Sequence, residues 1–157
     1  MHPRARSFAE RAAAEHDLEV DVHEFPEGTK TAADAADAIG CDVAQIASSL
    51  AFLAPDLVVV VTSGANRVSE SRLADLRDVS ESEVAMADAD DVRETLGWSI
   101  GGVPPFCHET DVPVCLDETL TGFETVWAAA GTPEAVFPIA PDRLEALAGA
   151  AVVDVTE

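Results

Sequence analysis

Two apolar runs separated by a short turn constrain the fold more than any other feature of this sequence. Residues Ile46–Leu53 form an apolar run of strand length, and Leu57–Thr62, with four consecutive valines, predicts a second buried strand. Pro55 and Asp56 lie between the two runs and predict a turn, which makes the pair a β-hairpin. We therefore expect the core of the protein to contain a β-sheet.

Helical and strand-like segments alternate along the rest of the chain. Apolar residues at helical spacing predict helices over residues 3–16 and 31–39 and shorter ones after Ser69, after Ala87 and from Pro141. Further strands are expected at residues 19–23, 84–86, 112–116, 124–129, 135–139 and 151–155. Because strands outnumber helices and several are consecutive, we expect an α+β fold. It is a single domain over residues 1–157, with a mixed, barrel-like sheet and helices outside it.

The stretch Gly97–His108 predicts a stiff loop, because three glycines and two adjacent prolines fall within it. Glycine permits close backbone approach and positive φ, whereas proline fixes φ and removes an N–H donor. We expect the apolar residues Ile100, Val103 and Phe106 to anchor this loop to the core. Such a loop with bare backbone N–H groups suits binding of a carboxylate, carbonyl or phosphate. A tight structural corner is the alternative interpretation.

The charge of the chain is strongly acidic. The chain has thirty Asp and Glu residues but only nine Lys and Arg residues, so its net charge is −21, and Lys30 is the only lysine. Dispersed acidic residues with almost no lysine are typical of a halophilic cytoplasm, where salt shortens the Debye length to ~3 Å near 1 M. An acidic protein of an ordinary cell is the alternative. In a halophilic cell, net negative charge does not exclude a nucleic-acid partner.

No apolar run is long enough to span a membrane, and no secretory signal is visible, so we expect a cytoplasmic protein without a membrane partner. The cysteines Cys41, Cys107 and Cys115 are few and odd in number, which fits a reducing compartment. They lack a second close pair, so neither a zinc site nor another cofactor is expected. Ser63 and Ser99 lack a nearby His–Asp pair, although His108 is within sequence reach, so a hydrolytic triad would form only if folding brought its members together by chance.

Ser48 is a small hydroxyl within an apolar strand. Strand alternation places it on one face with Ile46, Leu50 and Phe52. Two interpretations are open for Ser48: a buried serine bonded to the backbone, or a residue that lines a pocket.

Several segments, taken in order, resemble the YbaK family, which is similar to the editing domain of some bacterial prolyl-tRNA synthetases. The Gly-Gly-x-x-Pro pattern at Gly101–Pro105 resembles the pocket loop of that family, and Gln45–Phe52 resembles one of its strands. The other matching segments are residues 31–40, 62–68, 127–133 and 136–139. The resemblance covers roughly residues 25–150.

The resemblance implies trans-editing, in which the ester between a wrong small amino acid and tRNA is hydrolysed. The expected partners are an aminoacyl-tRNA and a synthetase, with no DNA and no cofactor. A small pocket suits this task. One methylene changes binding by only ~1–3 kcal/mol, so a synthetase cannot reject every similar amino acid, and a second site that admits only small acyl groups removes the errors. The resemblance points to catalytic positions at Ser48, Gly101 and Gly102, and to substrate-binding positions at Lys30, Thr31, Ser63, Gly64, Pro105 and His108.

The sequence departs from the family at one position, because well-studied members carry a lysine where this chain has Ser48. Three outcomes follow. The reaction is assisted by the substrate, with Ser48 positioning it; or the substrate is a different acyl ester; or the protein binds tRNA or a protein partner without catalysis.

Overall fold

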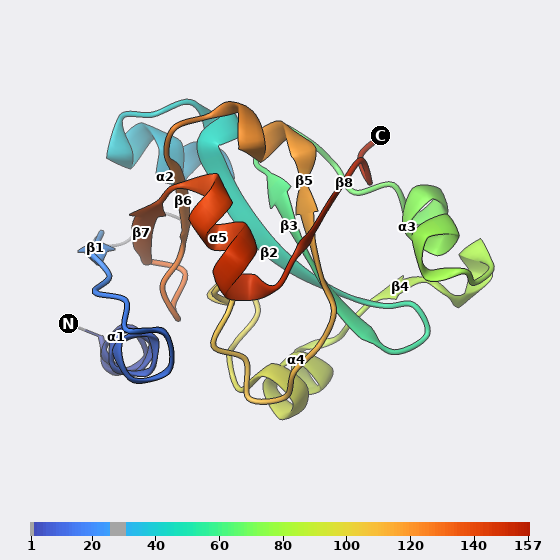
Figure 1. Ribbon diagram of the computed structural model, residues 1–157, viewed down its shortest axis with the longest axis horizontal. Coiled ribbons are helices and arrows are strands. Elements are labelled where there is room, and N and C mark those ends of the chain that lie inside the picture. The colour runs from blue at the N-terminus through green and yellow to red at the C-terminus, as the bar shows by residue number, and fades with distance from the viewer. Residues whose placement is uncertain (1, 26–30) are drawn as a thin grey trace.

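The predicted hairpin forms the middle of an eight-stranded mixed sheet (Figure 1). The computed structural model describes residues 2–25 and 31–157. Strands β2 (Ile46–Leu53) and β3 (Leu57–Ser63) pair antiparallel from Ala47 opposite Ser63 to Leu53 opposite Leu57. Every residue of β3 is buried, as its valine run predicts.

Both parallel and antiparallel pairs join the remaining strands to this hairpin, so the predicted mixed sheet is confirmed. Strand β6 (Val126–Ala129) runs parallel to β2, and β5 (Val114–Asp117) runs parallel to β3. The strands that flank the hairpin are β1 (His23–Glu24), β7 (Ala135–Ile139) and β6 on the β2 side, and β5 and β8 (Ala151–Val153) on the β3 side. A further short strand, β4 (Ala85–Met86), pairs with the end of β2.

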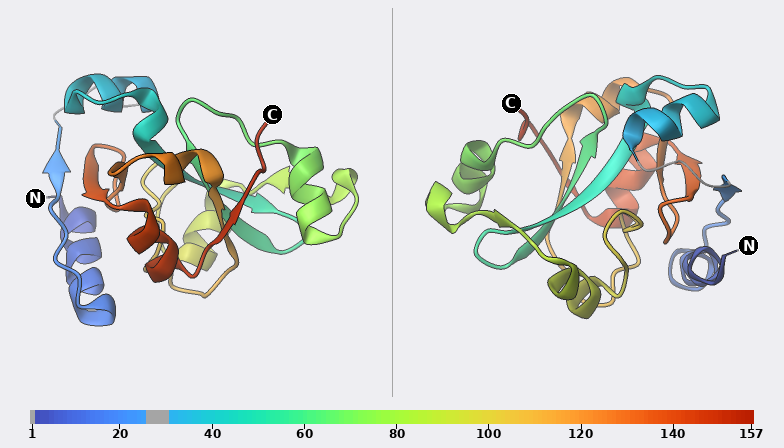
Figure 2. Two further views of the ribbon diagram at one scale, coloured as in Figure 1. Left: turned by 45° about the horizontal axis from the view of Figure 1, so that its top comes forward. Right: turned by 180° about the vertical axis from the view of Figure 1, so that it is seen from behind.

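Helices surround the sheet, and the views agree that α1 and α3 lie at opposite ends of the molecule (Figure 2). The helices are α1 (Pro3–His16), α2 (Ala32–Ile39), α3 (Glu70–Arg77), α4 (Ala89–Leu96) and α5 (Pro141–Ala148). Three 3-10 turns occur at Val43–Gln45, Glu81–Glu83 and Glu118–Gly122. Within the described residues, no helix combines the length and the apolar character needed to cross a bilayer.

The start and end of α2 follow from local sequence. The Thr31 hydroxyl accepts a hydrogen bond from the Asp34 N–H at 3.1 Å, which caps the first turn. Gly40 ends the helix with a φ of +88°, a left-handed conformation that glycine adopts without strain. Both features match the prediction from the sequence.

The predicted strand over residues 19–23 is largely wrong. Only His23 and Glu24 pair with a neighbour, at Val136 and Ala135 on the edge of β7. Val20 and Val22 are half-buried against the core without joining the sheet. The alternation of apolar residues therefore reports one-sided burial of an irregular segment rather than strand pairing.

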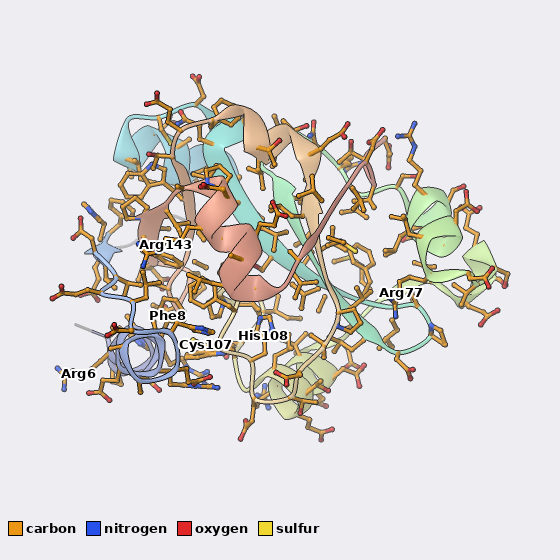
Figure 3. The ribbon with its side chains drawn as sticks, viewed as in Figure 1. Arg6, Phe8, Arg77, Cys107, His108 and Arg143 are labelled. Atoms are coloured by element: carbon orange, nitrogen blue, oxygen red, sulfur yellow. The ribbon has the colours of Figure 1, made fainter. Side chains whose placement is uncertain are left out.

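Phe8 holds α1 against the body of the protein (Figure 3). This side chain is fully buried, and its ring centroid lies 5.0 Å from that of Phe137, 5.6 Å from that of Phe106 and 6.2 Å from that of Trp98. Trp98 and Phe106 belong to the predicted stiff loop. The helix therefore helps to fix that loop.

Asp117 is a buried carboxylate that ties the end of β5 to the end of β3. It accepts hydrogen bonds from the Asn66 side chain at 2.9 Å and from the N–H groups of Ser63 and Thr119, each at 3.0 Å. Burial alone would raise the pKa of Asp117, but these hydrogen bonds outweigh it and hold the pKa below its ordinary value.

Asp117→Asn is expected to lower the free energy of unfolding by about 2 kcal/mol at neutral pH, because a buried charged acceptor is lost. A folded-state pKa below the unfolded value of about 3.9 means that this stabilisation is present above that pH. It disappears as the pH falls through the folded-state pKa. Urea unfolding at pH 7 and at about pH 3 measures both effects. The exposed Asp37→Asn is the control, and equal losses at both pH values would contradict the prediction.

Candidate functional site

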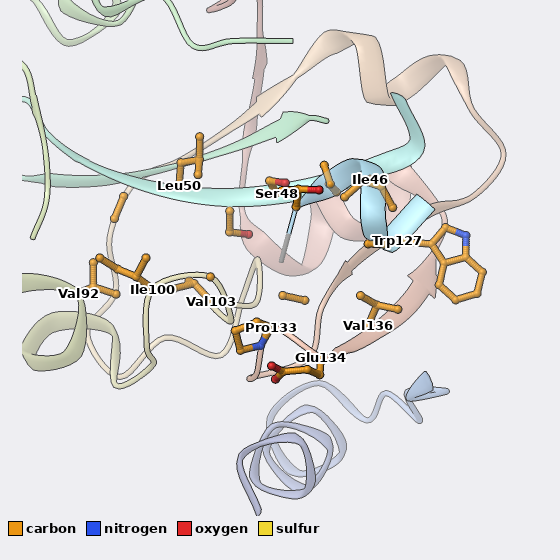
Figure 4. A pocket seen from close by; sticks show the side chains of 18 of the residues that line it. Ile46, Ser48, Leu50, Val92, Ile100, Val103, Trp127, Pro133, Glu134 and Val136 are labelled. Atoms are coloured by element: carbon orange, nitrogen blue, oxygen red, sulfur yellow. The ribbon is translucent and has the colours of Figure 1, made fainter. Parts of the chain in front are cut away.

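A pocket of about 470 Å³ opens between β2, the glycine–proline loop (residues 97–108) and the turn that joins β6 to β7 (Figure 4). Ser48 and Gly101 both line it. A cavity therefore lies between the strand of Ser48 and the loop of Gly101.

The inner end of the pocket is apolar and the walls are built from small side chains. Six alanines line it: Ala32, Ala35, Ala47, Ala51, Ala87 and Ala129. Ala47, Val92 and Val103 are 1–3% exposed, whereas Met86 and Ile100 at the mouth are 61% and 53% exposed. The prediction that Ile100 anchors the loop to the core is therefore wrong, although Val103 and Phe106 do so. This arrangement suits a small, largely apolar group.

Gly101 occupies the turn Ser99–Gly102 at a position that requires glycine. The Gly102 N–H donates to the Ser99 carbonyl at 3.0 Å, and Gly101 has a φ of +88°, as the third residue of a type II turn requires. No hydrogen bond from the Gly101 N–H to any residue in 2–25 or 31–157 is present. The turn therefore supplies, beside the pocket, one amide that has no partner among the residues that the structure describes.

Gly102 has a packing role. A Cβ placed on it would lie 2.6 Å from the Cα of Thr132, so only glycine allows the glycine–proline loop to contact the β6–β7 turn this closely. Its N–H is already used within the Ser99–Gly102 turn. The expectation of two glycine amides facing a carbonyl is thus reduced to Gly101 alone.

Ser48 is half-exposed on β2, and its hydroxyl makes no hydrogen bond with the described residues. This geometry favours the pocket-lining interpretation over a serine bonded to the backbone. The next residue, Ser49, also lines the pocket, and its hydroxyl oxygen is shielded from solvent without a partner in the described part of the chain.

Thr31 lies at the exposed edge of the pocket, where it also caps α2. Lys30, the neighbouring substrate-binding candidate, lies outside the described residues.

Ser63 and Gly64 lie outside the pocket lining and have packing roles. The Ser63 hydroxyl donates to the Ala44 carbonyl at 2.7 Å. The Gly64 N–H donates to the Ile46 carbonyl at 2.8 Å, and a Cβ on Gly64 would lie 2.6 Å from the Val43 carbonyl oxygen. Both residues therefore fix the entry into β2.

Pro105 and His108 belong to the glycine–proline loop but do not line the pocket. Pro105 is buried, and the His108 Nε2 lies 2.8 Å from the Pro104 carbonyl oxygen. Burial lowers the pKa of His108, which favours a neutral ring. The contact between the His108 ring and the Pro104 carbonyl stabilises the conformation of the glycine–proline loop.

One group of possible metal ligands is present among the described residues, away from the pocket lining. Donor atoms of Glu15, His16 and Cys107 lie within 4.8 Å of one another. Arg11 already pairs with Glu15 at 2.8 Å. Burial, together with the charge of Glu15, raises the pKa of the Cys107 thiol to about 11. The thiol is therefore protonated at neutral pH, and a metal ion bound here would have to displace that proton and compete with Arg11 for Glu15.

Glu134 is a pocket residue that the sequence did not single out. It lies in the β6–β7 turn, and its Oε2 accepts a hydrogen bond from the buried Thr132 hydroxyl at 2.9 Å. Of the pocket-lining residues that the structure describes, Glu134 alone carries an ionisable side chain. The available sequence signal was its place directly after the Gly131-Thr132-Pro133 turn.

The chain belongs to the family of the aminoacyl-tRNA editing domain, which matches residues 26–147. It is 31% identical over 128 residues to the uncharacterized protein YwhH of Bacillus subtilis (strain 168), covering 80% of each chain. The predicted resemblance to the YbaK family is thereby confirmed.

Solved structures agree with this assignment. A structure described as a candidate trans-editing enzyme for prolyl tRNA synthetase superposes with a TM-score of 0.93 at 39% identity, covering 100% of this chain and 99% of the other. The structure of hypothetical protein APE2540 superposes with a TM-score of 0.84 at 26% identity, covering 96% of this chain and 99% of the other.

Proposed function

We propose that this protein is a trans-editing deacylase, which hydrolyses the ester of a mischarged small amino acid on tRNA in the cytoplasm, beside an aminoacyl-tRNA synthetase. The observation that carries the proposal is the alanine-lined pocket, bounded on one side by Ser48 and on the other by the Gly101 N–H, which has no partner within residues 2–25 and 31–157. The family assignment supplies the class of substrate.

The Gly101 amide serves as the donor to the ester carbonyl. Negative charge develops on the carbonyl oxygen as a water molecule attacks the acyl carbon, and a fixed N–H stabilises that charge. The bond between the acyl carbon and the ribose oxygen then breaks. The amino acid leaves as a free carboxylate. One of the two protons of the attacking water goes to the ribose oxygen, and the other goes to solvent.

The neighbouring ribose hydroxyl of the substrate assists the attack in this proposal, because Ser48 carries no charge. The Ser48 hydroxyl positions the substrate at the pocket wall. Thr31 is assigned to substrate binding at the exposed edge of the pocket, and Lys30 stays a candidate for substrate binding. Ser63, Gly64, Gly102, Pro105 and His108 support the pocket from outside.

A direct assay tests the proposal. The protein is incubated in molar KCl with tRNAs charged with alanine, serine, cysteine or proline, and loss of the ester is followed. Hydrolysis of at least one ester well above the spontaneous rate is expected. Retained tRNA binding without hydrolysis of any ester would instead establish the second candidate function, a binding protein without catalysis. That alternative is favoured by one observation, the serine at position 48 where well-studied members carry lysine.

Ser48→Lys is expected to raise the deacylation rate about tenfold, because an ammonium group beside the pocket stabilises developing negative charge. Ser48→Met is the matched control, since it adds a side chain of similar reach without charge. A rate increase in the methionine variant equal to that of the lysine variant would show that charge is not the cause.

A further inference from the structure

We propose that Glu134 is a specificity-determining residue that binds the free α-ammonium group of the acyl moiety, so that the site selects aminoacyl esters over esters without that amine. This inference rests on the proposed function and names the chemical group that the site recognises.

The position of Glu134 relative to Gly101 carries the inference. Glu134 follows Thr132 and Pro133 in one turn, and a Cβ on Gly101 would lie 3.4 Å from the Pro133 Cγ. The neighbouring Gly102 backbone contacts Thr132 directly. The unpaired Gly101 N–H and the Glu134 carboxylate are therefore on two segments that pack against each other at the edge of one pocket.

An α-amino acid ester presents the matching pair of groups. Its carbonyl oxygen accepts a hydrogen bond, and its ammonium, two bonds from the carbonyl carbon, donates hydrogen bonds and carries a positive charge. The amide of Gly101 complements the first group and the carboxylate of Glu134 complements the second. The rest of the described pocket lining is uncharged, so no other described lining residue offers a counter-charge to the ammonium.

Thr132 orients the carboxylate for this role. Its side chain is 3% exposed, and its hydroxyl donates to the Glu134 Oε2 at 2.9 Å. A buried donor restricts the rotation of an otherwise exposed glutamate, which lowers the entropic cost of binding a cation.

The experiment compares two esters that differ only in the amine. Alanyl-tRNA is deaminated with nitrous acid to lactyl-tRNA, which carries a hydroxyl in place of the ammonium. Each enzymatic rate is divided by the spontaneous rate of the same ester, because the two esters differ in intrinsic lability. The wild-type protein is expected to favour the alanyl ester about tenfold on this scale, the size of one modest charge-assisted contact.

Glu134→Gln is expected to lower hydrolysis of the alanyl ester about tenfold and to leave the lactyl ester unchanged. The control Glu94→Gln changes an exposed carboxylate on α4 outside the pocket lining and should affect neither ester. An equal loss for both esters in Glu134→Gln would overturn the inference, because Glu134 would then act as a general base or only support the turn. No change for either ester would also overturn it.

A binding measurement separates this inference from the proposed function. Calorimetry with the stable 3′-alanylamido and 3′-lactylamido analogues of adenosine reports recognition of the amine without any hydrolysis. We expect about tenfold tighter binding of the alanyl analogue, and loss of that difference in Glu134→Gln. If the protein hydrolyses no ester but shows this difference, the catalytic proposal fails and the recognition stands. If the wild-type protein binds both analogues equally, the recognition fails.

Discussion

Gly101→Val is expected to reduce deacylation by at least about 100-fold while leaving the fold intact. Gly101 has a φ of +88°, and a β-branched residue in that conformation is strained by about 1–3 kcal/mol. The turn Ser99–Gly102 would relax to a different geometry, which redirects the Gly101 N–H away from the pocket. Loss of one donor to a developing oxyanion costs on the order of 100- to 1000-fold in other hydrolases.

Rates of the variant and the wild-type protein are compared well below their melting temperatures, with circular dichroism as the test of folding. Gly122→Val is the matched control, because a Cβ on Gly122 meets nothing within 4 Å and its φ is not positive. A folded Gly101→Val protein that keeps the wild-type rate would remove Gly101 from the mechanism.

Phe8→Ala is expected to lower the free energy of unfolding by about 3–5 kcal/mol, which is more than we expect for Asp117→Asn. The ring is fully buried and contacts Trp98, Phe106 and Phe137, so its removal leaves a cavity between α1 and the glycine–proline loop. Denaturant unfolding in molar KCl measures the loss.

The half-buried Phe123→Ala is the control and should cost clearly less. If the two variants lose the same stability, α1 is not held to the loop by Phe8. The family match begins at residue 26, after α1, yet this helix packs on the loop that carries Gly101. A stability loss at Phe8 is therefore expected to lower the deacylation rate as well.

Signals that act over a few residues were predictable from the sequence. Thr31 and Gly40 bound α2 because capping depends only on neighbouring backbone groups. The valine run predicted β3 because it follows another apolar run across a short turn, and the two runs pair as a hairpin. The strand predicted over residues 19–23 was wrong because a strand needs a neighbouring strand to pair with, and only the end of that segment reaches β7. The alternation of apolar and polar side chains does not indicate whether a partner strand lies within reach.

The candidate site was predictable only in part. The proximity of Ser48 and Gly101 was inferred from the resemblance of ordered segments, since the two residues are far apart in the sequence. Ile100 was misassigned because its apolar side chain suggested burial, whereas its place in an exposed turn directs it to the pocket mouth. Glu134 was missed because it is one of thirty acidic residues and only the fold distinguishes it from the others.

The two edges of the sheet are short, and this has a consequence for solubility. The strands at the two ends of the sheet order, His23–Glu24 and Ala151–Val153, are only two and three residues long, so each offers another chain little strand to extend. In concentrated salt, the repulsion between molecules of charge −21 is screened and no longer keeps them apart. The brevity of these edges then limits amyloid-like association by strand addition, so colloidal stability does not depend on charge alone.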